Sequence, residues 1–370
     1  MGNYTVLENG IKYAELDGTQ GSYAIGKQNG EIFKKEIQEN LKAIKNHFEK
    51  TIGKQASENL YYRMAYEMDY LKDLEKHMPS LHEELMGIKD GSGISLEDAF
   101  LLNYIEEPRA IIASDQLDGR CTSGMIYGRE HHPNILFQNM DYARYFNNFQ
   151  TLYKIQYADK EILLYGFVGQ FGGIGINSHG LSVTVNTIIN GRINIGSGIP
   201  STAITRGFLE MDNVNSCQDW IQKIPASTAN FYATVNDKKA VYYEMSANDI
   251  IIKDNLESCF MARANHAVNS NDVIERKWFR GKELLKDKEG QTIANTLERY
   301  NLINNILEDQ AEDATETDVQ NILSKKPILR SSEDSLTLQS MIAFCKRNES
   351  YLFVARGDDP LRKYVKMDFN

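Results

Sequence analysis

The sequence predicts an α+β protein in which two antiparallel sheets stack on each other and helices cover them. Three observations lead to this fold class. Helical periodicity dominates the chain up to about residue 120. Short strand patterns joined by turns dominate after that point. Helical stretches then interrupt the strands, and a pair of strands closes the chain.

The N-terminal region reads as a series of amphipathic helices. Apolar residues recur at helical spacing over 31–48 and again over 60–85. Pro79 divides the second region into two helices, because proline interrupts a helix except in its first turn. Ser95 is a good N-cap for the next helix, and the acids Glu97 and Asp98 would face its positive dipole end.

The region after residue 120 reads as strands, most of them in hairpins. The predicted pairs are 124–128 with 135–138, 152–156 with 162–168, 174–177 with 181–186, 231–235 with 240–245, and 336–345 with 351–355. A further strand is expected at 250–253. Helices are expected at 201–221, with Ser201 as N-cap, and at 273–308.

Charge and hydropathy exclude several classes of protein. The 370 residues include 41 Lys and Arg against 51 Asp and Glu, so the net charge is −10. Nucleic acids and anionic membranes need a basic surface, so we expect neither as a partner. A mean hydropathy of −0.46 without a long apolar run predicts no membrane-inserted helix. The N-terminus shows no signal peptide, which favours a cytoplasmic protein.

The four cysteines are Cys121, Cys217, Cys259 and Cys345. Their wide spacing, without a C-x-x-C pair, matches neither a disulfide framework nor a zinc module. It fits reduced thiols in a cytoplasm. We expect the last three cysteines to be structural. The adjacent His131 and His132 are expected in a hairpin loop rather than at a metal, since neighbours on a strand face opposite sides.

Cys121 stands where the helical region ends and the first predicted strand begins. If the bond between Arg120 and Cys121 were cut, the cysteine would gain a free α-amine beside its thiol. That amine, with an ordinary pKa of about 7.7–8.0, can act as the general base for its own side chain. The alternative is that Cys121 is a small buried hydrophobic residue, as free cysteines commonly are.

Six segments, in the same order, resemble the motifs of one enzyme family. They are 21–30 (GSYAIGKQNG), 118–122 (DGRCT), 138–141 (QNMD), 175–186 (GINSHGLSVTVN), 264–266 (ANH) and 328–330 (ILR). The sequence is similar to the penicillin acyltransferase-like N-terminal-nucleophile (Ntn) cysteine hydrolases, the family of isopenicillin N acyltransferase and acyl-CoA:6-aminopenicillanic acid acyltransferase. The resemblance covers almost the whole chain.

This resemblance implies a fold and a division of the chain. The fold would be the four-layer αββα sandwich of the Ntn hydrolases, with two antiparallel sheets and an N-terminal helical segment. Residues 1–120 would be that helical segment, which becomes an α subunit or propeptide after self-cleavage. Residues 121–370 would be the Ntn domain, or β subunit. The two parts would then form an α/β heterodimer from one precursor.

The resemblance also implies roles for site residues. Cys121 matches the nucleophile, and Asp141 matches the carboxylate that holds the freed α-amine. Asn265 matches the side-chain donor of the oxyanion hole, and Asn186 the residue that adds a backbone N–H. Arg330 matches an arginine that would pair with Asp141 or with a substrate carboxylate.

Each match has a plainer interpretation. Asp141 could be a surface carboxylate, Asn265 could lie in an ordinary loop, and Arg330 could belong to a solvated basic patch. The sequence also departs from the family. Arg120 stands where the penicillin enzyme has glycine, and Gln138 stands where bile salt hydrolases have arginine.

The implied activity is that of a self-processing cysteine N-acyltransferase or amidohydrolase working through a Cys121 acyl-thioester. It would need no cofactor or metal, with an acyl-CoA or acyl-carrier thioester as a candidate co-substrate, and would take a small-molecule acyl donor and an amine acceptor. Tyr142, Tyr145 and Phe146 form an aromatic cluster that would bind substrate if exposed, or belong to the core if not. The alternatives are a pure amide hydrolase and a non-catalytic, uncut binding protein on the same fold.

Overall fold

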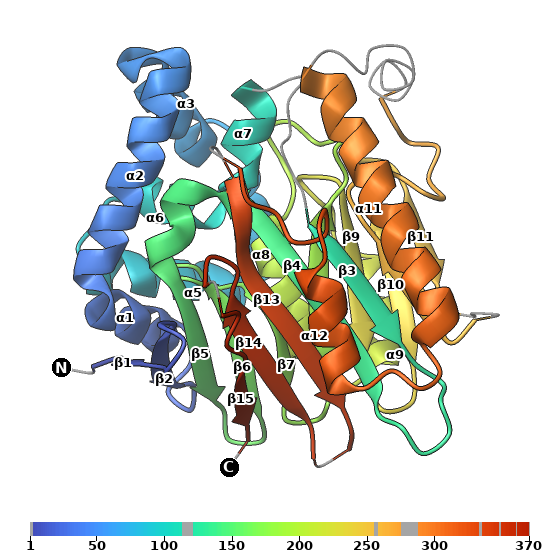
Figure 1. The fold of residues 1–370 in the computed structure, drawn as a ribbon. Helices are drawn as coiled ribbons and strands as arrows, with labels where there is room; N and C mark the ends of the chain where they lie inside the picture. The colour runs from blue at the N-terminus through green and yellow to red at the C-terminus, as the bar shows by residue number, and fades with distance from the viewer. Residues whose placement is uncertain are drawn as a thin grey trace.

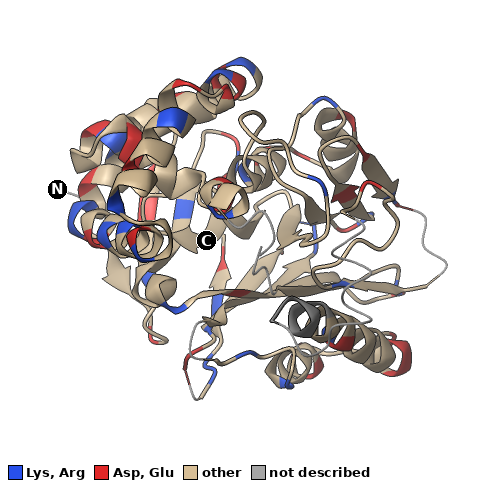
Figure 2. Cartoon of the chain, turned by 90° about the horizontal axis from the view of Figure 1, so that it is seen from above, with Lys and Arg blue, Asp and Glu red and all other residues tan. Residues whose placement is uncertain are grey.

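A computed structural model describes residues 3–112, 121–254, 258–274, 288–332, 335–347, 349–359 and 361–369. Two sheets stack face to face, and helices cover the outer face of each (Figure 1). Seen from above, the charged residues gather on the outer helices, while the strands between them carry few of them (Figure 2). The predicted α+β class and its αββα layers are therefore confirmed.

The helices of the described residues are α1 Ser22–Ile32, α2 Lys34–Ile52, α3 Lys54–Tyr66, α4 Tyr70–His77, α5 Pro79–Ser92, α6 Leu96–Asn103, α7 Glu106–Ile112, α8 Ser201–Leu209, α9 Val214–Ile221, α11 Lys288–Gln310 and α12 Glu316–Ser324. A 3-10 helix, η1, spans Arg144–Phe149. None of these helices is long and apolar enough to cross a membrane.

The strands fall into a nine-stranded and a six-stranded sheet. The larger has the order β1-β2-β5-β6-β7-β8-β9-β10-β11, and the smaller β12-β3-β4-β13-β14-β15. Their bounds are β1 Thr5–Val6, β2 Lys12–Asp17, β3 Thr122–Ile126, β4 Asn134–Ala143, β5 Gln150–Gln156, β6 Glu161–Phe167, β7 Gly173–Asn177, β8 Ser182–Thr187, β9 Asn230–Val235, β10 Ala240–Met245, β11 Ile250–Lys253, β12 Phe260–Arg263, β13 Ser335–Cys345, β14 Tyr351–Arg356 and β15 Val365–Asp368.

One strand pair corrects the prediction of purely antiparallel sheets. β2 pairs with β5 in parallel, so the N-terminal segment contributes two strands as well as helices. The hairpin signal could not reveal this pair, because its strands are separated by the whole helical region. A parallel pair needs such a crossover connection.

Apolar side chains fill three layers between the elements. Met125, Leu136 and Met341 of the smaller sheet meet Leu163 and Ile174 of the larger sheet in the central layer. The larger sheet packs its other face against α1–α6, α8 and α9. The smaller sheet packs its other face against α11 and α12. The predicted hairpins supply most of these strands, with ends shifted by a few residues.

The glycines of the first motif have a structural role. A Cβ on Gly26 would lie 1.9 Å from the carbonyl oxygen of Glu84, and one on Gly30 would lie 2.6 Å from the Ser92 nitrogen. Gly87 of α5 makes an equally close approach to α1. These contacts are shorter than side chains allow, so the two helices can pack this closely only because glycine stands at each crossing.

The helix boundaries give one confirmation and one correction. Ser95 caps α6, since its side chain accepts a hydrogen bond from the Asp98 N–H at 3.2 Å. Ser201 is not an N-cap, which is an error of the sequence prediction. Pro200 occupies that position in extended backbone, so Ser201 is already the first helical residue of α8. The helix predicted at 273–308 is described as α11, and residues 275–287 lie outside the described residues.

Candidate active site

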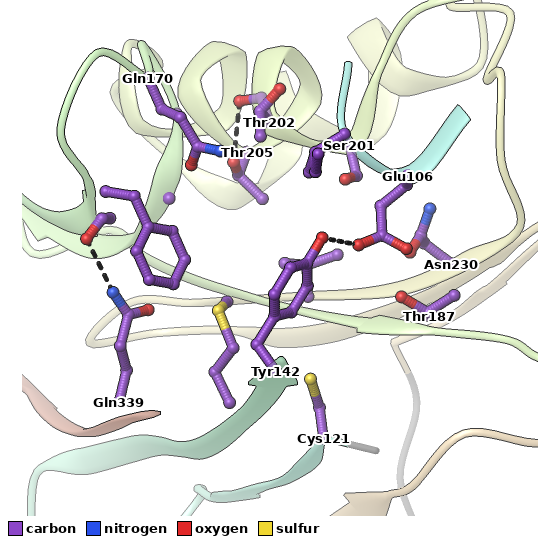
Figure 3. A pocket seen from close by; sticks show the side chains of 17 residues that line it. Glu106, Cys121, Tyr142, Gln170, Thr187, Ser201, Thr202, Thr205, Asn230 and Gln339 are labelled. Carbon is purple, nitrogen blue, oxygen red and sulfur yellow. Dashed lines mark hydrogen bonds between the residues drawn. The ribbon is translucent and has the colours of Figure 1, made fainter. Parts of the chain in front are cut away.

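Cys121 lies immediately before β3, which is an inner strand of the smaller sheet. It is 6% exposed, and its thiol points into a cavity between the sheets and the helices (Figure 3). Arg120, the other residue of the predicted cleavage site, lies outside the described residues. Cys121, the residue that the family resemblance identifies as the nucleophile, therefore lies beside a cavity.

The cavity has room for a small ligand. The empty space between its walls is about 570 Å³, counting the part that opens to solvent. The walls come from both sheets, α8 and the segment at α7: Ile105, Glu106, Cys121, Met140, Tyr142, Gly166, Phe167, Gln170, Gly172, Gly173, Val185, Thr187, Ser201, Thr202, Thr205, Asn230 and Gln339.

Asp141 is buried on β4, with 1% of its surface exposed. Its Oδ1 accepts a hydrogen bond of 2.6 Å from the Thr337 hydroxyl. Its charge raises the pKa of Cys121, so the two side chains are electrostatically coupled. The interpretation of Asp141 as a surface carboxylate is therefore wrong. A buried carboxylate beside Cys121 is suited to hold a cationic amine.

Burial raises the pKa of the Cys121 thiol to about 12, and the charge of Asp141 adds to this effect. A backbone hydrogen bond from Asp141 and the charge of Arg299 act in the opposite direction but do not outweigh it. The thiol of this chain therefore keeps its proton at neutral pH. Because the thiolate is the reactive form of cysteine, the site needs a base close to the sulfur.

Arg299 is a site residue that the sequence analysis missed. It projects from α11 and is 1% exposed. Its Nη1 donates to the carbonyl oxygen of Cys121 at 2.5 Å and to the Thr122 hydroxyl at 2.8 Å. Its Nη2 donates to Asn265 Oδ1 at 2.9 Å. One guanidinium thus connects the backbone of the candidate nucleophile to the candidate oxyanion donor.

Asn265 and Asn186 lie close together, as the family pattern implies. Asn265 is fully buried, and its Nδ2 donates to the Thr187 carbonyl at 2.8 Å. Asn186, also buried, donates from Nδ2 to the carbonyl of Ala264 at 3.2 Å. Its side chain therefore supports the backbone just before Asn265. These contacts make the Asn265 segment an ordered part of the core rather than an ordinary surface loop.

Gln138 joins the two sheets beside the site. Its Nε2 donates to the Val185 carbonyl at 2.5 Å, and its Oε1 accepts from the Val185 N–H at 3.1 Å. Because Val185 directly precedes Asn186, this double contact fixes β8 against β4. A glutamine in place of the arginine found in bile salt hydrolases thus has a structural role here.

Arg330 is linked to Asp141 through its backbone N–H and Thr337, whereas the described hydrogen bond of its guanidinium goes to Ser335 instead of the predicted carboxylate partner. Its Nε donates to the Ser335 hydroxyl at 2.7 Å, and its backbone N–H donates to the Thr337 hydroxyl at 2.9 Å. Thr337 in turn donates to Asp141. Arg330 is half-buried, whereas the neighbouring Lys325 and Lys326 are exposed. It is therefore a part of the Asp141 surroundings rather than of a solvated patch.

His266 lies beside Asn265 but is directed at α11. It is 4% exposed, its Nδ1 lies 3.3 Å from the Thr296 hydroxyl, and its ring packs edge-on against Tyr300. Burial lowers the pKa of His266 to about 4, and the charges of Arg299 and Arg263 add to this. The imidazole is neutral at physiological pH, and a base with so low a pKa is poorly matched to neutral pH.

The aromatic cluster divides between cavity and core. Tyr142 lines the cavity, and its hydroxyl donates to Glu106 Oε1 (Figure 3). Phe146 is fully buried in the core, and Tyr145 packs against His47 instead. Of the three predicted substrate-binding residues, the structure places Tyr142 at the cavity wall. Glu106, which the sequence analysis did not single out, lies there too.

Residues 129–352 match the family described as "Acyl-coenzyme A:6-aminopenicillanic acid acyl-transferase". No curated protein matches the sequence significantly. Among solved structures, penicillin V acylase from Agrobacterium tumefaciens is similar with a TM-score of 0.45 and 10% sequence identity. The alignment covers 67% of this chain and 86% of that chain. We draw no residue correspondence from a similarity this low.

Proposed function

Because the chain belongs to the acyl-coenzyme A:6-aminopenicillanic acid acyl-transferase family, we propose that it is a self-processing cysteine acyltransferase or amide hydrolase. The observation that supports this most is the surroundings of Cys121. A buried thiol faces a cavity, and a buried carboxylate and a buried guanidinium lie against the same residue.

The reaction begins with attack of Cys121 Sγ on an acyl carbonyl. The S–C bond forms, the bond from the carbonyl to the leaving amine or thiol breaks, and the thiol proton passes through the α-amine of Cys121 to the leaving group. Water or an acceptor amine then attacks the thioester, and its proton returns to the sulfur by the same route. The Asn265 amide is the side-chain donor for the oxyanion, and Asp141 holds the amine.

Maturation uses the same thiol. Sγ attacks the carbonyl of residue 120, the peptide bond to the Cys121 nitrogen breaks, and water hydrolyses the resulting thioester. The products are an N-terminal chain ending at Arg120 and a C-terminal chain starting at Cys121, which together form the active heterodimer. The thiol proton passes to the departing Cys121 nitrogen, which becomes the free α-amine of the C-terminal chain.

The proposed substrates are small molecules. The acyl donor would be an amide, an acyl-CoA or an acyl-carrier thioester, and the acceptor an amine or water. A pure amide hydrolase differs only in the acceptor. The product distribution with and without added amine separates the two.

One variant tests the proposal. Cys121→Ala should remain a single chain of 42.2 kDa and should take up no acyl group, whereas the natural chain should be cut before residue 121 and should be acylated. A Cys121→Ala protein that is cut at the same bond would assign cleavage to a foreign protease. A natural chain that stays intact and unacylated would favour the non-catalytic binding protein, the alternative to which Arg120 in place of glycine points.

A further inference from the structure

Two glutamines of the cavity have their amide groups fixed in one orientation. Gln339 Nε2 donates to the Gly166 carbonyl at 2.8 Å, and Gln170 Nε2 donates to the Leu102 carbonyl at 2.8 Å. Turning either amide over would place two carbonyl oxygens against each other, so the backbone acceptors settle which atom is oxygen. Both Oε1 atoms must therefore point away from these carbonyls.

The oxygen of Gln339 is a buried acceptor without a donor. The residue is fully buried and lines the cavity, and its Oε1 has no hydrogen-bond partner among the described residues. Figure 3 shows this oxygen on the side of the amide that faces the other lining side chains. Buried amide oxygens almost always have a donor, so this exception calls for one.

Three of the five hydroxyl groups that line the cavity already donate their protons to other acceptors. Thr202 donates its proton to the Asn103 carbonyl at 2.8 Å, and Thr205 donates to the Thr202 carbonyl at 2.9 Å. Tyr142 donates to Glu106. These three hydroxyls keep only lone pairs for a ligand. Much of the polar lining therefore favours a ligand with hydrogen-bond donors.

The distance of Gln339 from the thiol identifies the part of the substrate concerned. Gln339 pairs with Met140 across β13 and β4, and Thr122 pairs with Asn139 across β3 and β4. Two strand spacings of about 4.8 Å therefore separate Gln339 from Cys121, roughly 10 Å in all. An acyl group bound to Sγ would reach Gln339 with its distal end.

Charge argues for a neutral group at that end. Glu106 is the carboxylate of the cavity wall, and it is paired with Arg109 at 3.2 Å and lies on the other side of Tyr142 from Gln339 in Figure 3. An ammonium beside Gln339 would lose its hydration without gaining a counter-charge.

Given the proposed function, we propose that the acyl group of the substrate ends in a neutral hydrogen-bond donor, a hydroxyl or a carboxamide, that binds Gln339. The donor binds the unsatisfied oxygen of Gln339, and the amide oxygen of Gln170, another residue of the cavity wall, is a second acceptor. A terminal methyl group would instead displace water from these oxygens without replacing its hydrogen bonds, which costs affinity.

A series of acyl thioesters of equal chain length tests this inference. The probes are the N-acetylcysteamine thioesters of hexanoic, ω-hydroxyhexanoic, adipamic, ω-aminohexanoic and adipic acids. The readout is kcat/KM for acylation of Cys121, followed by intact mass, with pairs of probes in competition on the natural mature enzyme. We expect the hydroxyl or carboxamide probe to exceed hexanoyl by roughly 10- to 100-fold.

A variant and a matched control locate the effect. Gln339→Met keeps the side-chain volume but removes the acceptor, so the preference for the hydroxyl or carboxamide probe over hexanoyl should fall to about one. Gln150→Met changes another buried glutamine, one that accepts from Tyr165 outside the cavity, and should keep the preference. The competition on the natural enzyme stands even if a variant does not fold.

The outcomes separate this inference from the proposed function. Equal rates for hexanoyl and its hydroxyl or carboxamide analogues, or a preference for the carboxylate or ammonium probe, would overturn the inference while leaving the acylation of Cys121 intact. Acylation at a residue other than Cys121 would overturn the proposed function itself. A preference that survives Gln339→Met would show that another residue receives the donor.

Discussion

Arg206 and Arg299 are both buried arginines, in different parts of the molecule. Arg206, on α8, is fully buried and lies 3.1 Å from Glu84 of α5 and 3.0 Å from Glu210. Burial raises the pKa of Glu84 to about 7 even though Arg206 opposes the effect. This cluster lies within the helical layer and joins two helices, so its charges neutralise each other and have a structural role.

The hydrogen bonds that connect Arg299 to the described part of the site go to neutral oxygens. Its acceptors include the carbonyl of Cys121 and the side chain of Asn265. The difference teaches that burial alone does not assign a role to an arginine. The guanidinium of Arg206 is paired with carboxylates and holds two helices together. The guanidinium of Arg299 connects the candidate nucleophile to the candidate oxyanion donor, so we expect it to position reacting groups.

The sharpest way to break this comparison is to replace both arginines by methionine. Arg299→Met should reduce kcat by roughly 10²–10³, with a smaller change in KM, because it releases Asn265 and the Cys121 backbone. Arg206→Met should lower the free energy of unfolding by about 3–5 kcal/mol, since it leaves Glu84 buried without its partner. The kcat of the folded fraction of Arg206→Met should equal that of the natural enzyme.

Kinetics and urea unfolding of the two variants provide the measurement. Arg299→Lys serves as the control for charge, and should recover part of kcat. Should Arg299→Met lose only stability, or should Arg206→Met lose kcat as Arg299→Met does, the two arginines would have the same role and the comparison would fail.

Three residues of the candidate site sharpen the assignment of the base. Asn265→Ala should cost roughly 10²–10³ in rate by loss of an oxyanion donor. Asp141→Asn should be more damaging than His266→Gln, because it removes the charge that holds the α-amine. Turnover of one amide or thioester substrate by the mature variants gives the ranking. If His266→Gln proves the most damaging of the three, a histidine base replaces the N-terminal amine.

The pH dependence of stability gives a smaller effect. Burial lowers the pKa of His266 to about 4, against about 6.5 in an unfolded chain. The unfolded state therefore binds the proton more readily than the folded state. The free energy of unfolding should accordingly rise between the folded and the unfolded pKa of His266, by at most about 3 kcal/mol. In His266→Gln, the free energy of unfolding measured with urea should lose this part of its dependence on pH. The exposed His131, changed to Gln, should leave the slope unchanged.

Labelling of cysteines tests the smallest structural difference, the one between two thiols of unequal burial. Cys259 is half-buried and Cys121 buried, so exposure alone favours the reaction of iodoacetamide with Cys259. Activation by the freed amine favours Cys121 instead. We expect limiting reagent to label Cys121 first in the mature enzyme and to abolish activity, with Cys259→Ser behaving identically. Loss of activity that follows the labelling of Cys259 would contradict the assignment of the nucleophile.

The strands were predictable because each hairpin carries its own local signal. Alternating apolar residues and a polar turn predict β5 with β6 and β9 with β10, and the structure confirms both. The pairing of β2 with β5 depends on segments far apart in the chain, which no local pattern records. The N-cap at Ser201 was missed for a related reason, since proline at 200 moves the helix start by one residue.

The site was predictable only where a motif marks it. Cys121, Asp141, Asn186 and Asn265 stand in segments that resemble the family, and the structure places all four in the buried region around the cavity. Arg299 stands in an amphipathic helix, where an arginine ordinarily faces solvent. The orientation of that helix over the smaller sheet decides that the arginine is buried, and this orientation is a property of the tertiary structure.

The central claim is that Cys121 becomes an N-terminal residue and carries the acyl group on its own sulfur. Peptide mass mapping of the natural protein after incubation with a hexanoyl or ω-hydroxyhexanoyl thioester tests both parts at once. The account predicts a C-terminal chain that begins at Cys121, with one acyl group on that residue. Hydroxylamine should remove the acyl group, because it cleaves thioesters. An intact chain, or an acyl group on any other residue, would contradict it.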